Sequence, residues 1–360
     1  MLLWTMLMLG QVAAPEDQAY MRELRRGQEK AVDLMIRVDL QPLAKPQKSP
    51  KHGWDFPHVA SGFGRPAGNE GPLNLRFRVF SQFRRTQGDI ADPITRMLIR
   101  LWDQNYRRLQ LDHGARFARL VDVYLCFGGK AGGEQLFDQE ERNGQMVPVN
   151  TIYLYEITSF TDPMEMAREI AHEYGHATLP PIGGFTQPEF WVNGDLGERL
   201  FLKWKLEALE KGEITERDVM NVPLATLKDW VGKKVTPLSD AVWNQGPRLP
   251  ILKGKDLVAL DAFLGLVLFA DEILPDEILG TTLFANADET ATGFEKALRE
   301  TLKEGPGFTI ASKKWIGKTV WLPLEGRSVK GLRRLSAGKG WTSGVVEADS
   351  LVVAEKAAKE

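Results

Sequence analysis

His172-Glu173-Tyr174-Gly175-His176 is the stretch of this 360-residue chain that decides the expected fold and chemistry. On an α-helix the two histidines lie four residues apart, about 6 Å along the axis and on one face, so both imidazoles can bind one ion. Glu173, next to His172, is then placed to hold and deprotonate a water at the open position of that ion. The pattern predicts a catalytic zinc site on a helix.

The residues before this motif predict a strand followed by that helix. Residues 151–158 are rich in β-branched and aromatic side chains, which favour a strand. Asp162 is a suitable N-cap, Pro163 is tolerated in the first turn, and Glu165 completes a capping-box pattern. We expect the helix to end by Pro180-Pro181. Its buried side is predicted from apolar residues at three- and four-residue steps, namely Met166, Ala167, Ile170, Ala171 and Tyr174.

A third ligand is expected from the next helix, for which residues 191–206 carry an amphipathic pattern. Asp195 and Glu198 lie three residues apart and share a face. Glu198 is the predicted ligand because it sits a turn inside the helix, and Asp195 is either the alternative ligand or a partner to a zinc-bound histidine. A third interpretation has Asp195 and Glu198 forming a capping box with neither bound to metal.

These residues resemble the zincin metallopeptidases, and among them the gluzincins, in which a helix bearing His-Glu-x-x-His precedes a second helix that gives a glutamate ligand. Trp191-Val192-Asn193 resembles the aromatic-x-Asn motif that often precedes this glutamate. The chain departs from the aminopeptidase-like pattern at Gly194, where those enzymes place the glutamate. The resemblance covers about residues 150–205.

The resemblance implies amide hydrolysis with one zinc ion, bound by His172, His176 and Glu198, and with Glu173 as the general base. It also implies that the strand at 151–158 is an edge strand that pairs with extended substrate. No tyrosine follows Tyr174 and no histidine follows His176. The group that stabilises the transition state must therefore lie elsewhere, and Tyr153 and Tyr155 are candidates, with ordinary strand packing as the alternative for each.

The whole chain is expected to have an α+β fold: a zincin-like catalytic core, a mainly helical C-terminal half and a small β appendage. The N-terminal region is expected to be helical up to Pro42 and Pro46, with a Gly- and Pro-rich linker at 51–72. A buried helix is expected at 256–274. The predicted parts are a signal peptide (1–14), a helical segment with its linker (15–72), a catalytic region (73–212), a helical region (213–305) and a β-rich tail (306–360).

The N-terminal residues, the net charge and the cysteine content indicate where the protein is located and which partners it can bind. The apolar run Met1–Leu9 followed by Val12-Ala13-Ala14 predicts a short signal peptide, and hence a secreted or periplasmic protein. The run is too short to span a bilayer. The net charge of −2 argues against a nucleic-acid partner. A lone cysteine, Cys126, excludes an intrachain disulfide and is expected in the core.

Two classes of function follow from the sequence. The first is a zinc-dependent peptidase that acts on peptides or proteins. The second is a binding or structural protein on a zincin-like scaffold whose activity has lapsed. Retention of Glu173 favours the peptidase, because a lapsed site has no chemical need for that carboxylate. The sequence leaves the cleavage preference and the oligomeric state open.

Overall fold

The computed structural model describes residues 34–66, 73–82, 90–111, 120–142, 144–338 and 340–354. These residues form a mixed α and β structure, which confirms the expected class. By its internal contacts the chain divides into two compact units. The first comprises Met1–Arg107, Leu111–Leu179 and Phe201–Leu227; the second comprises Arg108–Gln110, Pro180–Leu200 and Lys228–Glu360. This division differs from the boundaries expected at 212 and 305. The predicted signal peptide lies outside the described residues.

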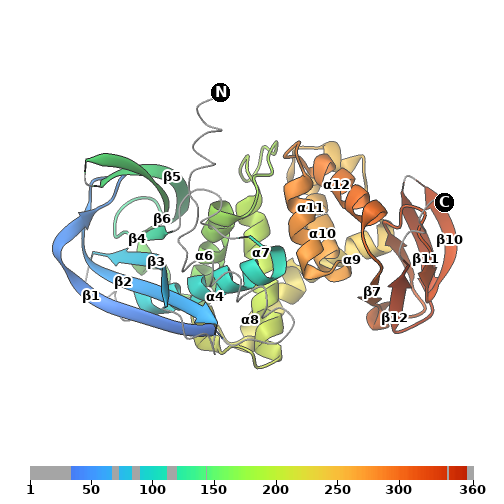
Figure 1. Ribbon diagram of the computed structural model, residues 1–360, viewed down its shortest axis with the longest axis horizontal. Coiled ribbons are helices and arrows are strands. Elements are labelled where there is room, and N and C mark those ends of the chain that lie inside the picture. The colour runs from blue at the N-terminus through green and yellow to red at the C-terminus, as the bar shows by residue number, and fades with distance from the viewer. Residues whose placement is uncertain are drawn as a thin grey trace. The chain divides into compact units, whose positions relative to one another are not determined.

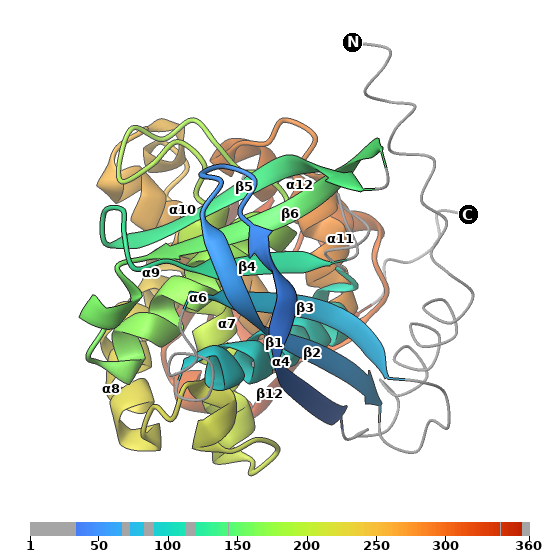
Figure 2. The ribbon, with the colours of Figure 1, turned by 90° about the vertical axis from the view of Figure 1, so that its left-hand side faces the viewer.

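The first unit is built on one six-stranded sheet in the order β1-β2-β3-β4-β6-β5 (Figures 1 and 2). Its strands are β1 (Leu34–Lys48), β2 (Asp55–Pro66), β3 (Asn74–Ser81), β4 (Val121–Leu125), β5 (Gly132–Arg142) and β6 (Gln145–Tyr155). The central strands β3, β4 and β6 are parallel, and the other pairings are antiparallel. All five residues of β4 are buried, so the middle of the sheet is covered on both faces.

The helical segment and linker expected over 15–72 are wrong for the described residues 34–66, which form β1 and β2. The apolar residues Leu34, Ile36, Val38 and Leu40 alternate with other side chains, a period of two that the helical interpretation overlooked. Pro42 and Pro46 are tolerated in this strand because β1 lies at a sheet edge and its register shifts between Pro42 and Gln47.

The glycines of β2 led us to expect a loop, but in the structure Gly62 and Gly64 lie in a strand, where they leave room for a helix to pack. A Cβ atom at Gly62 would lie 2.4 Å from Cγ2 of Thr95, and one at Gly64 would lie 2.9 Å from Cγ2 of Ile99. Both contacts come from the helix α4 (Asp92–Leu109). The glycines therefore let α4 approach the sheet closely.

The motif helix is α6 (Pro163–Thr178), and its predicted start is confirmed: the Asp162 side chain accepts a hydrogen bond from the Met164 backbone N–H at 2.9 Å. The next predicted helix is also present, as α7 (Asn193–Glu210). Tyr174 of α6 packs on Phe201 of α7 with ring centroids 5.9 Å apart.

Helices α4 and α6 lie on the same face of the sheet. The side chain of Asn150 on β6 donates a hydrogen bond to the carbonyl of Ala177 on α6 at 3.2 Å, and Phe77 on β3 contacts Tyr174 with centroids 5.7 Å apart. Side chains one position along each strand point to the opposite face. A second core cluster lies there, formed by Phe56, Val59, Phe80, Tyr124, Cys126, Tyr153 and Tyr155.

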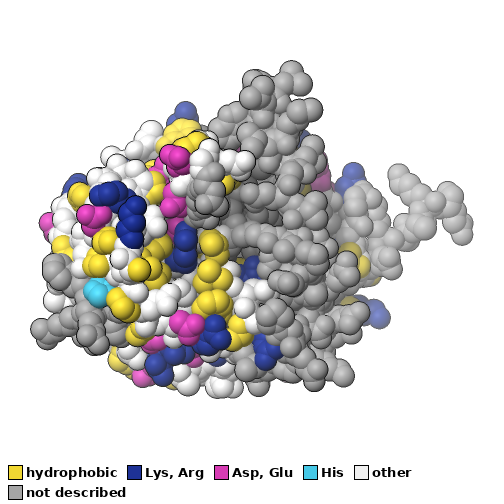
Figure 3. Space-filling model, turned by 60° about the vertical axis from the view of Figure 1, so that its left-hand side comes forward, with side chains coloured by type: hydrophobic (Ala, Val, Ile, Leu, Met, Phe, Trp, Pro, Cys, Tyr) yellow, Lys and Arg dark blue, Asp and Glu magenta, His cyan; other side chains and the backbone are white. Residues whose placement is uncertain are grey.

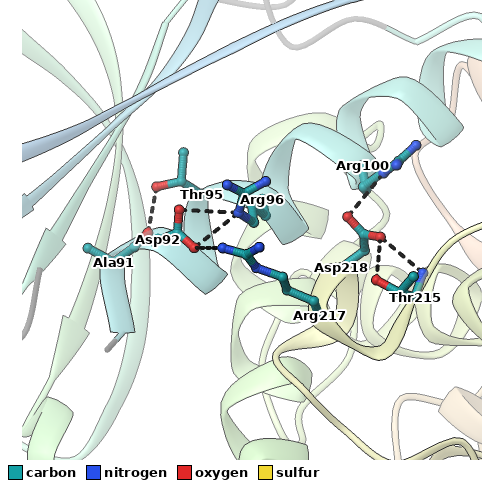
Figure 4. Close-up of polar contacts among 8 residues, drawn as sticks. All are labelled: Ala91, Asp92, Thr95, Arg96, Arg100, Thr215, Arg217 and Asp218. Carbon is teal, nitrogen blue, oxygen red and sulfur yellow. Dashed lines mark hydrogen bonds and ion pairs between the residues drawn. The ribbon is translucent and has the colours of Figure 1, made fainter. Parts of the chain in front are cut away.

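Ion pairs join α4 to the turn that follows α7 (Figure 4). Arg100 on α4 contacts the Asp218 carboxylate at 3.3 Å, and Arg217 contacts Asp92 at 3.3 Å. Asp218 also accepts hydrogen bonds from the backbone N–H and the hydroxyl of Thr215. These contacts fix the C-terminal part of α7 beside α4.

The second unit is helical, followed by short strands. It contains α9 (Thr236–Gln245), α10 (Leu257–Ile273), α11 (Asp276–Ala285), α12 (Ala291–Glu304) and two three-stranded sheets, β10-β11-β8 and β7-β12-β9. Their strands are β7 (Phe308–Ala311), β8 (Thr319–Leu322), β9 (Val329–Lys330), β10 (Leu332–Gly338), β11 (Trp341–Val346) and β12 (Ser350–Val353). The buried helix and the β-rich tail were both predicted.

The surface of the described residues carries mixed chemistry. Basic, acidic and hydrophobic side chains are interspersed over the described part of the face in Figure 3. Within the described ranges, no helix combines the length and hydrophobicity that crossing a membrane requires.

Candidate metal centre

The two motif histidines point toward one another from successive turns of α6. Their Nε2 atoms are 3.2 Å apart, and their rings are inclined by 73°. Two imidazole nitrogens on one tetrahedral zinc ion, each bonded at 2.0–2.1 Å, would be separated by about 3.3 Å. The pair therefore has the spacing that a shared ion requires, although the same distance also lets one ring N–H donate to the other ring.

Carboxylates complete two candidate ligand sets. Among the described residues, His172, His176 and Glu189 form one set and His172, Asp195 and Glu198 form the other; the ligand atoms of each set lie within 4.8 Å of one another. His/His/carboxylate sets of this kind suit zinc. Both predicted carboxylates thus belong to a candidate set, and so does Glu189, which was not predicted.

No sequence pattern marks Glu189 as a candidate metal ligand. It lies in the connection between α6 and α7, in a stretch with no periodic pattern, and its neighbours Pro188 and Phe190 indicate only a turn. The one available signal was a carboxylate close in sequence to the His-Glu-x-x-His helix.

Asp195 and Glu198 are both buried in the first turns of α7. Asp195 Oδ1 accepts a hydrogen bond from Arg199 at 2.8 Å, whereas its buried Oδ2 has no hydrogen-bond partner among the described residues. A buried carboxylate oxygen without a donor is costly, and a bound cation or a histidine N–H would satisfy it. Because α7 begins at Asn193, Asp195 lies inside the helix, which does not fit the capping-box alternative.

Glu173 is buried and lies against the sheet. A Cβ atom built at Gly133 of β5 would lie 2.5 Å from Cγ and 2.6 Å from Oε1 of Glu173. Glu169, one turn earlier, is almost as close, at 2.7 Å. The start of β5 therefore passes directly over the expected general base, and only glycine allows this approach.

The expectation that residues 151–158 form an edge strand is wrong. The strand predicted at 151–158 corresponds to β6, which is paired on both sides, with β4 and with β5. β5 forms this edge of the sheet. The sequence analysis missed β5, although Gly132-Gly133 followed by a long polar run is typical of an exposed strand that approaches another group closely.

Tyr153 and Tyr155 are not brought to the histidines. Asn150 points toward α6, so the odd-numbered residues of β6 point to the other face, where both tyrosines belong to the second core cluster. Burial raises the pKa of the Tyr153 hydroxyl, and the same effect raises that of Tyr155. The structure therefore gives neither tyrosine a place beside Glu173.

Cys126 lies in the same cluster, and burial raises the pKa of its thiol to about 12. This confirms the expected core position of Cys126. At neutral pH its sulfur is a protonated thiol rather than a metal-binding thiolate.

Comparisons of this chain with protein-family models, with curated proteins and with solved structures found no significant match. The case for a function therefore comes from the residues themselves.

Proposed function

We propose that this protein is a zinc-dependent peptidase. The observation that carries the proposal is the His172–His176 pair, whose Nε2 atoms are 3.2 Å apart, beside a buried Glu173 that the backbone of β5 covers. A structural histidine pair needs no carboxylate such as Glu173 at this position. A hydrolase that activates water needs one within reach of the ion.

The chemistry divides between the ion and the chain. When bound, zinc supplies Lewis-acid polarisation of a carbonyl group and lowers the pKa of a water. Glu173 takes a proton from the attacking water at its carboxylate and passes it to the leaving amine. Among the described residues β5 pairs with a strand on one side only, and its other side offers backbone N–H and C=O groups to an extended peptide beside Glu173.

The direct test compares wild-type protein with Glu173→Gln, which keeps the size of the side chain but removes the base. We expect one zinc per chain in both proteins, and hydrolysis of an unstructured protein substrate such as casein by the wild type alone. The loss of kcat in the variant should be roughly 10²–10⁴-fold. Zinc content is measured by atomic emission, and hydrolysis by release of new amines.

Glu165→Gln is the matched control, because Glu165 is an exposed carboxylate on the same helix, two turns before the motif. Its activity should equal that of the wild type. Zinc bound by the wild type without chelator-sensitive hydrolysis would contradict the peptidase proposal and favour the lapsed, binding function.

The third ligand is proposed to be Glu198, since a ligand on a helix is held more firmly than one on a connection. Glu198→Gln, Asp195→Asn and Glu189→Gln should then differ in zinc affinity. We expect the largest loss for Glu198→Gln and a loss of roughly 10–100-fold for Asp195→Asn, whose role is to orient a ligand. A loss confined to Glu189→Gln would assign the position to Glu189 instead.

A further inference from the structure

A hydrogen-bonded network on the outer face of the sheet joins the β1–β2 turn to β5. Tyr155 donates a hydrogen bond from its hydroxyl to Oε2 of Glu134 at 2.8 Å, and His52 Nε2 lies 2.8 Å from the same hydroxyl. Lys51 donates to Oε1 of Glu134 at 2.6 Å. These four residues, which we call the brace, bring together the turn, β6 and β5.

The hydrogen bonds from His52 to Tyr155 and from Tyr155 to Glu134 both point toward the Glu134 carboxylate. The single hydroxyl proton of Tyr155 goes to Glu134, so His52 must donate to the hydroxyl oxygen through a protonated Nε2. Partial burial favours the neutral acid of Glu134, but the hydrogen bonds from Lys51 and Tyr155 outweigh it and lower the pKa of that carboxyl. Glu134 is therefore ionised at neutral pH and accepts from both sides.

The turn that carries Lys51 and His52 is itself held in place. The backbone N–H of Ser49 donates to the carbonyl of Trp54 at 2.9 Å, and the Trp54 N–H donates back to the Ser49 hydroxyl. The Trp54 ring stacks on the His52 ring with centroids 4.2 Å apart. The backbone N–H of Lys51 also donates to the Tyr153 hydroxyl at 3.1 Å.

Glu134 follows Gly133 directly in β5, and adjacent strand residues point to opposite faces. One face of this short segment is thus tied down by the brace, while the other face, at Gly133, contacts Glu173. Gly132 has φ of +130°, a conformation that glycine adopts readily and other residues rarely do. Gly132 and Gly133 are paired with Tyr155 and Leu154 of β6, and the side chain of Glu134 adds a second restraint on the opposite face.

We infer that Lys51, His52, Tyr155 and Glu134 act as positioning residues, which hold the start of β5 at a fixed distance from Glu173. The inference rests on the proposed function for its catalytic consequence. It gives a role to Tyr155 that differs from contact with the reacting groups. Without the brace, only the pairing with β6 holds the two glycines, so the start of β5 opens more often and Glu173 is fixed less firmly.

The test uses the full chain and the variant Tyr155→Phe, which removes the bridging hydroxyl and keeps the ring in the core. Two quantities are measured: amide hydrogen exchange of peptides covering residues 130–137, and the kcat and KM of casein hydrolysis by zinc-loaded protein. We expect exchange to rise about 10-fold in that segment and kcat to fall roughly 10-fold, with zinc content unchanged.

Tyr124→Phe is the matched control. Tyr124 lies on the neighbouring strand β4 in the same cluster, and its buried hydroxyl has no hydrogen-bond partner within the described part of the chain. This variant should leave both quantities at wild-type values. His52→Gln, which can donate from the same place, should retain more activity than His52→Ala.

The outcomes separate the two proposals. Faster exchange with lowered kcat supports the brace and the peptidase together. Faster exchange in a protein that hydrolyses nothing supports the restraint on β5 but overturns the proposed function. Unchanged exchange in Tyr155→Phe, or faster exchange with unchanged kcat, overturns the positioning role.

Discussion

Gly133 is the residue whose replacement probes the contact between β5 and Glu173. In Gly133→Ala the added methyl would meet Cγ and Oε1 of Glu173, so this buried side chain must shift to make room. We therefore expect the unfolding free energy to fall by about 1–3 kcal/mol. A displaced base should lower kcat roughly 100-fold. Urea unfolding and steady-state kinetics measure the two effects.

Gly338→Ala makes the same change in another strand, where no atom of the described residues lies within 4 Å of the new methyl. It should leave kcat at the wild-type value. An unaltered kcat in Gly133→Ala would show that the contact with Glu173 has no catalytic meaning.

Lys205 is fully buried on α7, and its ammonium nitrogen has no hydrogen-bond partner among the described residues. Burial, reinforced by the charge of Arg100, lowers the pKa of Lys205 well below its usual range, against the attraction of Asp218 and Asp103. The folded protein therefore favours neutral Lys205, whereas the unfolded chain keeps its proton up to a pKa of about 10.4.

This difference predicts the sign of a pH dependence. Between the lowered pKa and about 10.4 the unfolded state binds the extra proton, so the stability contributed by Lys205 rises with pH. The slope from one group is at most about 1.4 kcal/mol per pH unit. Lys205→Met should remove that slope. Urea unfolding measured from pH 7 to 9.5 checks it, and identical slopes in both proteins would show that Lys205 stays charged when folded.

The close packing of α4 on β2 explains the glycines of β2, a strand that was not predicted from sequence. Gly62→Ala would place a methyl 2.4 Å from Cγ2 of Thr95, and overpacking of this kind costs about 1–3 kcal/mol. Thr95→Ser removes that methyl group. We expect Gly62→Ala to destabilise the wild type but to cost much less in the Thr95→Ser background, in a double-mutant cycle by urea unfolding. Equal costs in both backgrounds would contradict this packing.

Elements with strong local signals were predictable. The N-cap at Asp162 and the apolar periodicity before His172 are local to one helix, so α6 followed from the sequence. β1, β2 and β5 were not predicted, because their glycines and prolines make sense only beside a distant partner. Gly62 needs α4, and Gly133 needs α6. No pattern within a short window contains that information.

In the molecule as a whole, the residues of the candidate site that lie on one helix could be predicted from sequence, and those that depend on distant segments could not. The histidine pair and Glu173 could be predicted because one helix carries all three. Glu198 could be preferred to Asp195 only from its position in a helix, and Glu189 was not predicted, since the distances of these carboxylates to His172 depend on how α7 and the preceding connection fold. Glu189 shares a candidate set with both histidines, whereas Glu198 shares one with His172 and Asp195. The bracing role of Tyr155 required the strand order, which places β5 outside β6.

Anomalous diffraction at the zinc absorption edge, from crystals of full-length protein prepared with one equivalent of zinc, would locate a bound ion directly. We expect one strong peak bonded to Nε2 of both His172 and His176 at about 2.0–2.1 Å, with a carboxylate oxygen at a similar distance. Absence of a peak there, with the two imidazoles hydrogen-bonded to each other instead, would contradict this expectation.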